Sequence, residues 1–477
     1  MRATPNAGMA EMKAFRRFSL FLVPSVFQAG MSFVLLPVST YFLDPADFGL
    51  FALISSMTAL IGVVSTLGSS YLLARYFPVL GYAEQVRLIS SLTWVAVPIG
   101  TACGALLVLL WPVIAPLAFD SAAPEITLVV IAVAAMILVL PWTIAVDVIR
   151  LAGRAYLYAA AIIGQSIASA SALLLCLLIL EKGVESLFIA ALAGAGVLFA
   201  GALYLLAPYL RALPDRRYAA ELFSVGRLFL LSGFAESFHQ TMERTILAAR
   251  GGLGQVGLYS HSQMYRTAAT MPVSAVSDTA WAVTLAEARS DTSRFERTER
   301  AWNAAHLWLT LVGLVLATLG SHVIAILTHD KFTEAHAIAA LWTVYLLAQN
   351  CGKPQTALFY AYGHGGSYAL IQTAAMAIGT GLLFLLVPSF GMYGALAAAF
   401  AQQIFLRVGV QWRARTIRRT PFQDHWAIAG AAFITATLLS KLAIGGTLAV
   451  DSAILAAALA LFLMAARRRV VSVWRTI

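Results

Sequence analysis

About fourteen long apolar runs fill this sequence, and its lysines and arginines fall almost entirely in every second gap between them. Such an excess of basic residues is characteristic of the cytoplasmic ends of membrane helices. About 25 basic residues lie on one predicted side and about four on the other. The pattern therefore predicts a polytopic membrane protein and its orientation. Three basic residues remain inside the apolar runs: Arg244, Arg266 and Lys353.

Composition excludes an ordinary soluble domain. Hydrophobic residues make up 60% of the chain and charged residues 11%, and the mean hydropathy is +0.82. Soluble domains carry about 25% charged residues. The basic cytoplasmic ends account for the net charge of +10, so we expect no nucleic-acid partner. Cys103, Cys176 and Cys351 fall within apolar runs and are expected to be buried thiols without disulfides.

The apolar runs predict an all-α fold with fourteen transmembrane helices. An even number places both termini on one side, and the basic segments near both ends place that side in the cytoplasm. The first run is too long for a signal peptide and has no small-residue cleavage site before Asp44, so we expect it to be retained as a span. The predicted spans are Phe18–Phe42, Phe48–Leu73, Leu88–Leu117, Ile126–Ile149, Tyr156–Leu180, Ser186–Leu206, Phe223–Ala248, Val256–Leu285, Ala301–Leu327, Ala335–Tyr360, Ser367–Val387, Met392–Gln411, His425–Leu442 and Ala453–Ala466.

The chain also repeats itself. FGLFA around Gly49 matches VGLYS around Gly257. The glycine corners at Gly183 and Gly391 are separated by the same number of residues as Gly49 and Gly257 are. These matches predict two duplicated six-span halves, residues 1–215 and 216–420, followed by two additional spans in residues 421–477. Parallel repeats in transporters are related about the membrane normal and bind substrate between them, near the midplane.

Polar residues form stripes along several predicted spans. In the seventh span, Ser232, Glu236, His239 and Glu243 recur at helical spacing. Arginine or lysine at the bilayer centre costs about 2.5–3.5 kcal/mol on insertion scales, so such helices should face water or one another. A polar cavity between the halves is the simplest account. Its candidate residues are the cations Arg75, Arg244, Arg266 and Lys353, the titratable groups Glu236, His239, Glu243 and Asp278, and the amides Gln28, Gln263, Asn350 and Gln402. We expect Pro354 to kink the tenth span.

Glu236 and Arg266 lie at similar predicted depths. Each is about ten residues from one end of its span, or about 15 Å into the membrane. One interpretation is a buried ion pair that fixes two helices together. The other is a working site in the cavity, and the sequence leaves both open.

No motif of metal or nucleotide chemistry is present. The sequence lacks HExxH, paired CxxC and a Gly-rich GK[ST] loop, so we expect no metal, no cofactor and no nucleotide-driven motor. Predicted external loops are too short for a catalytic domain. We therefore expect a protein that is not an enzyme.

Three corners carry a family resemblance. They are LDPADFGLFAL at Leu43–Leu53, ERTILAARGGLGQVGLYSHS at Glu243–Ser262 and PSFGMYGALAA at Pro388–Ala398. With fourteen spans, the chain resembles the Wzx-type O-antigen and exopolysaccharide flippases of the multidrug/oligosaccharidyl-lipid/polysaccharide (MOP) exporter superfamily. Tyr41 departs from the family, which usually has a basic residue there, and this puts an outer phosphate contact at that position in question.

The resemblance implies two six-helix lobes around a V-shaped cavity that opens alternately to each side of the bacterial inner membrane. It implies that Arg75, Arg266 and Lys353, with Arg244 as a further candidate, receive the diphosphate-sugar head of an undecaprenyl-linked repeat unit. Proton or sodium exchange at the acidic groups would reset the transporter. Membrane lipids and the polysaccharide polymerase and chain-length machinery are the implied partners.

Two rival functions remain. A multidrug antiporter of the same superfamily should have an acidic and aromatic cavity with few cations, whereas the predicted cavity mixes both signs. A membrane glycosyltransferase or polymerase should carry a large outer loop or an acidic pair at an interface, and neither is found in the sequence.

Overall fold

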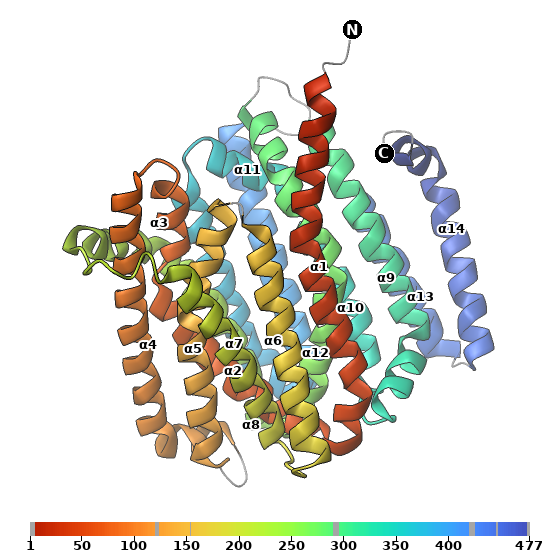
Figure 1. Cartoon of the computed structure of the whole chain (residues 1–477). Coiled ribbons are helices and arrows are strands. Elements are labelled where there is room, and N and C mark those ends of the chain that lie inside the picture. The colour runs from red at the N-terminus through yellow and green to blue at the C-terminus, as the bar shows by residue number, and fades with distance from the viewer. Residues whose placement is uncertain are drawn as a thin grey trace. The chain divides into compact units, whose positions relative to one another are not determined.

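The computed structural model describes residues 5–119, 124–152, 154–289, 295–418, 425–444 and 447–474. Every regular element in these ranges is an α-helix, which confirms the all-α prediction (Figure 1). Eight helices among the described residues are long and apolar enough to cross a membrane, and two shorter apolar helices accompany them. The chain is therefore a multi-pass membrane protein.

The helices follow the predicted spans closely. They are α1 (Pro5–Phe42), α2 (Pro45–Thr66), α3 (Ser69–Tyr76), α4 (Tyr82–Ala118), α5 (Ile126–Ala152), α6 (Ala155–Leu178), α7 (Glu185–Leu206), α8 (Arg216–Arg289), α9 (Glu296–Thr328), α10 (Ala335–Asn350), α11 (Lys353–Ala361), α12 (Gly365–Ile417), α13 (His425–Ile444) and α14 (Leu448–Trp474). Two of them contain two predicted spans each. The backbone leaves the helical conformation at Gly252 inside α8, where φ is 76°, and at Gly391 inside α12, where φ is 53°.

Two predicted spans are each broken into two helices. The second span separates into α2 and α3 at Leu67 and Gly68, both with positive φ. The tenth separates into α10 and α11 at Cys351 and Gly352, where Gly352 has a φ of 70°. The span is interrupted next to Pro354, as expected, and the backbone break itself lies at Cys351 and Gly352. Pro354 lies in the first turn of α11, where a missing N–H leaves no helical bond unmade.

The first corner motif begins α2. Asp44 precedes the helix in an extended conformation, and its amide donates to the Asp47 carboxylate at 2.9 Å. Pro45 occupies the first turn, where its fixed φ suits a helix. The motif found in the sequence therefore works as a helix start at a tight corner.

The chain forms two compact units, Met1–Leu253 and Gly254–Ile477. The first part of α8 belongs to the first unit, where Thr241 Oγ1 donates to the Ser56 carbonyl of α2 at 3.0 Å. Gly233 lets the two helices approach, since a Cβ there would lie 3.2 Å from Val63 Cγ1. The division into lobes at residues 215 and 420 stays a prediction.

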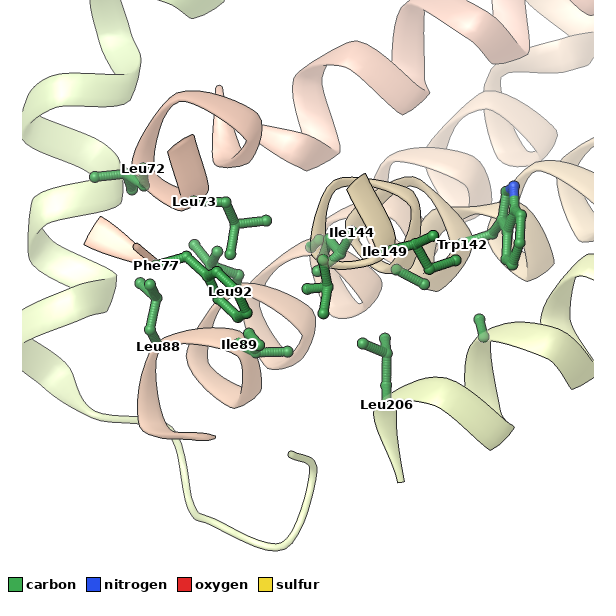
Figure 2. Close-up of a cluster of buried hydrophobic side chains, with 14 of the residues drawn as sticks. Leu72, Leu73, Phe77, Leu88, Ile89, Leu92, Trp142, Ile144, Ile149 and Leu206 are labelled. Atoms are coloured by element: carbon green, nitrogen blue, oxygen red, sulfur yellow. The ribbon is translucent and has the colours of Figure 1, made fainter. Parts of the chain in front are cut away.

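A buried apolar cluster holds α3, α4, α5 and α7 together in the first unit. Figure 2 shows its side chains, including Phe77, Leu92, Trp142 and Leu206. Hydrogen bonds attach the start of α8 to the edge of this cluster, where the Tyr218 hydroxyl donates to Glu84 at 2.8 Å. Burial, followed by this hydrogen bond, raises the pKa of Tyr218 to about 12.

In the second unit, α13 and α14 lie beside α9 (Figure 1). A buried ionic cluster attaches these helices to one another. The fully buried Asp451 accepts from His322 Nε2 at 2.7 Å and lies 3.1 Å from Lys441 Nζ. Lys441 also donates to Ser321 Oγ at 2.7 Å. His322, which the sequence presents as an isolated residue on an apolar helix, is thus part of a charged cluster. Removing Asp451 or Lys441 would leave the other as a buried charge without its ion-pair partner.

Glycines bring α9, α10 and α13 into close contact. A Cβ at Gly313 of α9 would overlap Ile434 of α13 and Thr343 of α10. Small residues at membrane helix interfaces allow such approach and the packing that follows from it.

We predict that Gly313→Ala lowers the stability of the protein by about 1–3 kcal/mol, because the added methyl group forces packed neighbours apart. Thermal unfolding in detergent measures this. Gly320→Ala is the matched control on the same helix, since a Cβ there meets its nearest atom at 3.8 Å. Equal unfolding midpoints for the two variants would contradict the packing account.

Candidate functional site

Arg266 lies on an aromatic support within the second unit. Its Cζ is 4.5 Å from the ring centre of Trp342 and 6.0 Å from that of Tyr345, both on α10. The Trp342 and Tyr345 rings meet edge to face at 5.1 Å. Cation–π contact of this kind attracts a guanidinium without neutralising its charge.

The support is itself fixed by hydrogen bonds. Trp342 Nε1 donates to Ser262 Oγ at 3.0 Å, and Ser262 Oγ donates to the Tyr259 carbonyl at 2.6 Å. Tyr259 and Trp342 are fully buried, so their rings are core residues and not a surface for stacking a ligand. We call Tyr259, Ser262, Trp342 and Tyr345 the Arg266 support.

The charge of Arg266 is not compensated locally. Within the described part of the second unit, no carboxylate lies at ion-pair distance from Arg266 and no acceptor receives its guanidinium N–H groups. The side chain is half-buried. A partly buried cation held by neutral aromatics can bind an anion.

The break between α10 and α11 carries a second cation. Lys353 begins α11, and its Nζ lies 5.2 Å from the ring centre of Trp302 on α9. Arg407 of α12 reaches the same break and donates to the Gln349 carbonyl. In the sequence, Arg407 is one of the many basic residues near the predicted cytoplasmic ends of the spans. No local sequence pattern distinguishes Arg407, because its contacts at the break are with residues 51 and 58 positions away.

The candidate residues of α8 in the first unit differ in exposure. His239 and Glu243 are buried one turn apart, Arg244 is half-buried and Glu236 is exposed. Glu236 and Arg266 belong to different compact units. The predicted pair between them therefore stays a prediction.

The remaining candidates are scattered. Arg75 is exposed at the end of α3, and its Cζ lies 5.1 Å from the ring centre of Tyr76. Gln28 is exposed and Gln263 half-buried. Buried Asn350 donates to the Leu346 carbonyl at 2.8 Å. Buried Gln402 packs closely against Gly379, because a Cβ added at Gly379 would overlap it. The Asp278 side chain lies outside the described residues.

The expectation that all three cysteines are buried is only partly met. Cys176 is buried, whereas Cys103 and Cys351 are only half-buried, and none of the three forms a disulfide. Cys351 lies at the break between α10 and α11. Its position beside this polar helix break accounts for its partial exposure.

The family model described as polysaccharide biosynthesis protein matches residues 16–288, more than half of the chain. The chain belongs to the polysaccharide biosynthesis protein family. No curated protein sequence matches it.

Solved structures share the fold of this polysaccharide biosynthesis protein. The lipid II flippase MurJ in an inward closed conformation aligns with a TM-score of 0.63 at 14% identity, covering 96% of this chain and 99% of MurJ. An inward-facing multidrug resistance MATE transporter of the MOP superfamily aligns with a TM-score of 0.57 at 16% identity, covering 84% and 95%. A variant of the Vibrio cholerae MATE transporter VcmN gives 0.55 at 16% identity, covering 86% and 98%. The chain therefore has the MOP-superfamily transporter fold.

We predict that Ser262→Ala destabilises this family member by about 1–3 kcal/mol, because it leaves the buried Trp342 N–H without an acceptor. Thermal unfolding of Ser262→Ala, Trp342→Phe and the double variant forms a double-mutant cycle. The double variant should be more stable than the sum of the two single losses implies. Strict additivity of the two losses would show that the hydrogen bond does not hold the Arg266 support together.

Proposed function

We propose that this protein is a flippase that moves undecaprenyl-diphosphate-linked oligosaccharide repeat units across the bacterial inner membrane by alternating access. The observation that carries the proposal is Arg266, a half-buried cation on neutral aromatics with no carboxylate partner among the described residues of its unit. Family membership and the MOP fold support it.

A diphosphate fits this chemistry. The planar guanidinium of Arg266 offers a bidentate fork for phosphate oxygens, and Lys353 offers a compact point charge. Pairing of this kind strengthens where water is excluded. Neutral aromatic support keeps Arg266 in position without competing for its N–H groups. We assign the substrate's phosphates to Arg266 and Lys353, with Arg75 and Arg244 as further cationic candidates.

The proposal includes location and coupling. We place both termini in the cytoplasm because the basic residues gather in the corresponding gaps. Buried His239 and Glu243, with Glu236 and Asp278, are the candidates for exchange of a proton or sodium ion. A polysaccharide polymerase and its chain-length machinery are the expected functional partners.

A multidrug antiporter is the second candidate, favoured by the likeness in fold to MATE transporters. A cationic drug needs acidic or aromatic groups in its site. Arg266 and Lys353, both outside any ion pair within the described part of their unit, would repel such a substrate. The two functions therefore predict opposite effects when these cations are removed.

Deletion of the gene should abolish a surface polysaccharide and leave lipid-linked repeat units on the inner leaflet. Complementation with Arg266→Ala should fail although the variant inserts, and Arg266→Lys should restore only part, because a point charge lacks the bidentate fork. Extracted lipid intermediates and surface polysaccharide are measured. Normal polysaccharide in the deletion strain, together with hypersensitivity to cationic drugs, would favour the antiporter.

The interpretation of Arg266 as half of a structural ion pair with Glu236 is tested in the same strain. If Arg266 only pairs with Glu236, then Glu236→Gln combined with Arg266→Gln should recover activity that either single change lost. We expect no recovery. An active double variant would reject Arg266 as a substrate contact.

A further inference from the structure

The break between α10 and α11 is imposed by the sequence. In a continuous helix, the amide of residue 353 would bond to the carbonyl of residue 349, and that of residue 354 to the carbonyl of residue 350. Pro354 has no N–H, and Gly352 adopts a φ of 70°. The break lies about 12 Å from the predicted cytoplasmic end of its span. Non-helical backbone at this depth is tolerated only in protein or beside a water-filled cavity.

Arg407 satisfies the open end of α10. Its Nη2 donates to the Gln349 carbonyl, which takes the place of the Lys353 amide in a continuous helix. Its Nη1 lies 3.5 Å from Thr356 Oγ1 on α11. With the Gln403 amide oxygen turned toward it, Arg407 also donates to that oxygen from Nε at 2.9 Å. One guanidinium therefore connects both helices of the break to α12.

The break gathers donors that need an acceptor. The Lys353 ammonium has no carboxylate within ion-pair distance among the described residues. The indole of Trp302 beside it is buried, and its Nε1 has no acceptor in the described part of the chain. A buried donor without a partner is costly.

We propose that the α10–α11 break is a phosphate-binding subsite in which Lys353 and the Trp302 indole N–H are the donors and Arg407 is the positioning residue. The proposal rests on the proposed function, because it assigns one phosphate of the diphosphate substrate to this place. Arg407 acts through Lys353, because it joins the open end of α10 to α11 and so fixes the position of the first turn of α11, where Lys353 stands.

Binding of undecaprenyl diphosphate to the purified full-length protein tests the subsite. Lys353→Gln should weaken binding by about tenfold or more, and Trp302→Phe by about threefold to tenfold. Trp308→Phe is the matched control on the same helix, because its indole already donates to the Ala269 carbonyl at 3.0 Å. It should leave the affinity unchanged. Wild-type affinity in Lys353→Gln or in Trp302→Phe would overturn the subsite.

The role of Arg407 is tested by a double-mutant cycle on the same affinity. Arg407→Gln should weaken binding about as much as Lys353→Gln, and the double variant should bind no worse than either. Arg407→Lys should restore part of the affinity. Arg413→Gln removes an equal charge from the same helix and should bind as the wild type does, because among the described residues Arg413 Nη1 donates only to Thr416 Oγ1 in its own turn. Independent, multiplying effects of Arg407→Gln and Lys353→Gln would overturn the positioning role.

Gln403→Leu provides a second variant if Arg407→Gln does not fold. It loosens Arg407 without removing a charge, and its smaller loss of affinity should vanish in the Lys353→Gln background. A loss of equal size in both backgrounds would overturn the proposal. If binding survives Arg407→Gln but requires Arg266 and Lys353, only the positioning inference fails. Absence of binding by the wild type overturns the subsite and the proposed function together.

Discussion

Backbone hydrogen bonding within the membrane constrains every part of this molecule. Because lipid offers no partners, each N–H and C=O must be satisfied inside the protein, which leaves helices as the regular structure here. Polar side chains follow the same requirement, as Thr270 Oγ1 bonds to the Arg266 carbonyl one turn earlier. Where the chain interrupts a helix at Gly352, Arg407 supplies the missing donor. The break and its cationic surroundings are thus parts of one arrangement.

The described charges form two classes. Asp451 and Lys441 compensate each other's charge in the second unit, and their contacts, with that of His322, attach α14 to its neighbours. Arg266 and Lys353 instead rest on aromatic rings, and the described part of their unit gives them no carboxylate. Helix attachment needs compensated charge, whereas recognition of an anion needs charge that is held but not compensated. This distinction is our basis for separating structural from functional candidates.

The sequence predicted helix positions well, because apolar runs and basic gaps respond to the same lipid boundary that ends a span. It also found Arg266 and Lys353, since a charge inside an apolar run is conspicuous. It did not separate polar stripes from functional faces, because hydroxyl groups such as those of Thr267 and Thr270 bond to their own helix. Arg407 and the Trp302 indole were missed because only tertiary packing brings them to the break.

Translocation in reconstituted liposomes tests the central claim most directly. The lipid-linked repeat unit extracted from the deletion strain would be incorporated with the purified protein, and its exposure to a membrane-impermeant sugar reagent followed with time. We expect all of the substrate to become reactive with the wild-type protein, and only the outer-leaflet half with Arg266→Ala. If the inner-leaflet half of the substrate stays as unreactive in liposomes with the wild-type protein as in liposomes without protein, the assignment of this chain as a flippase is contradicted.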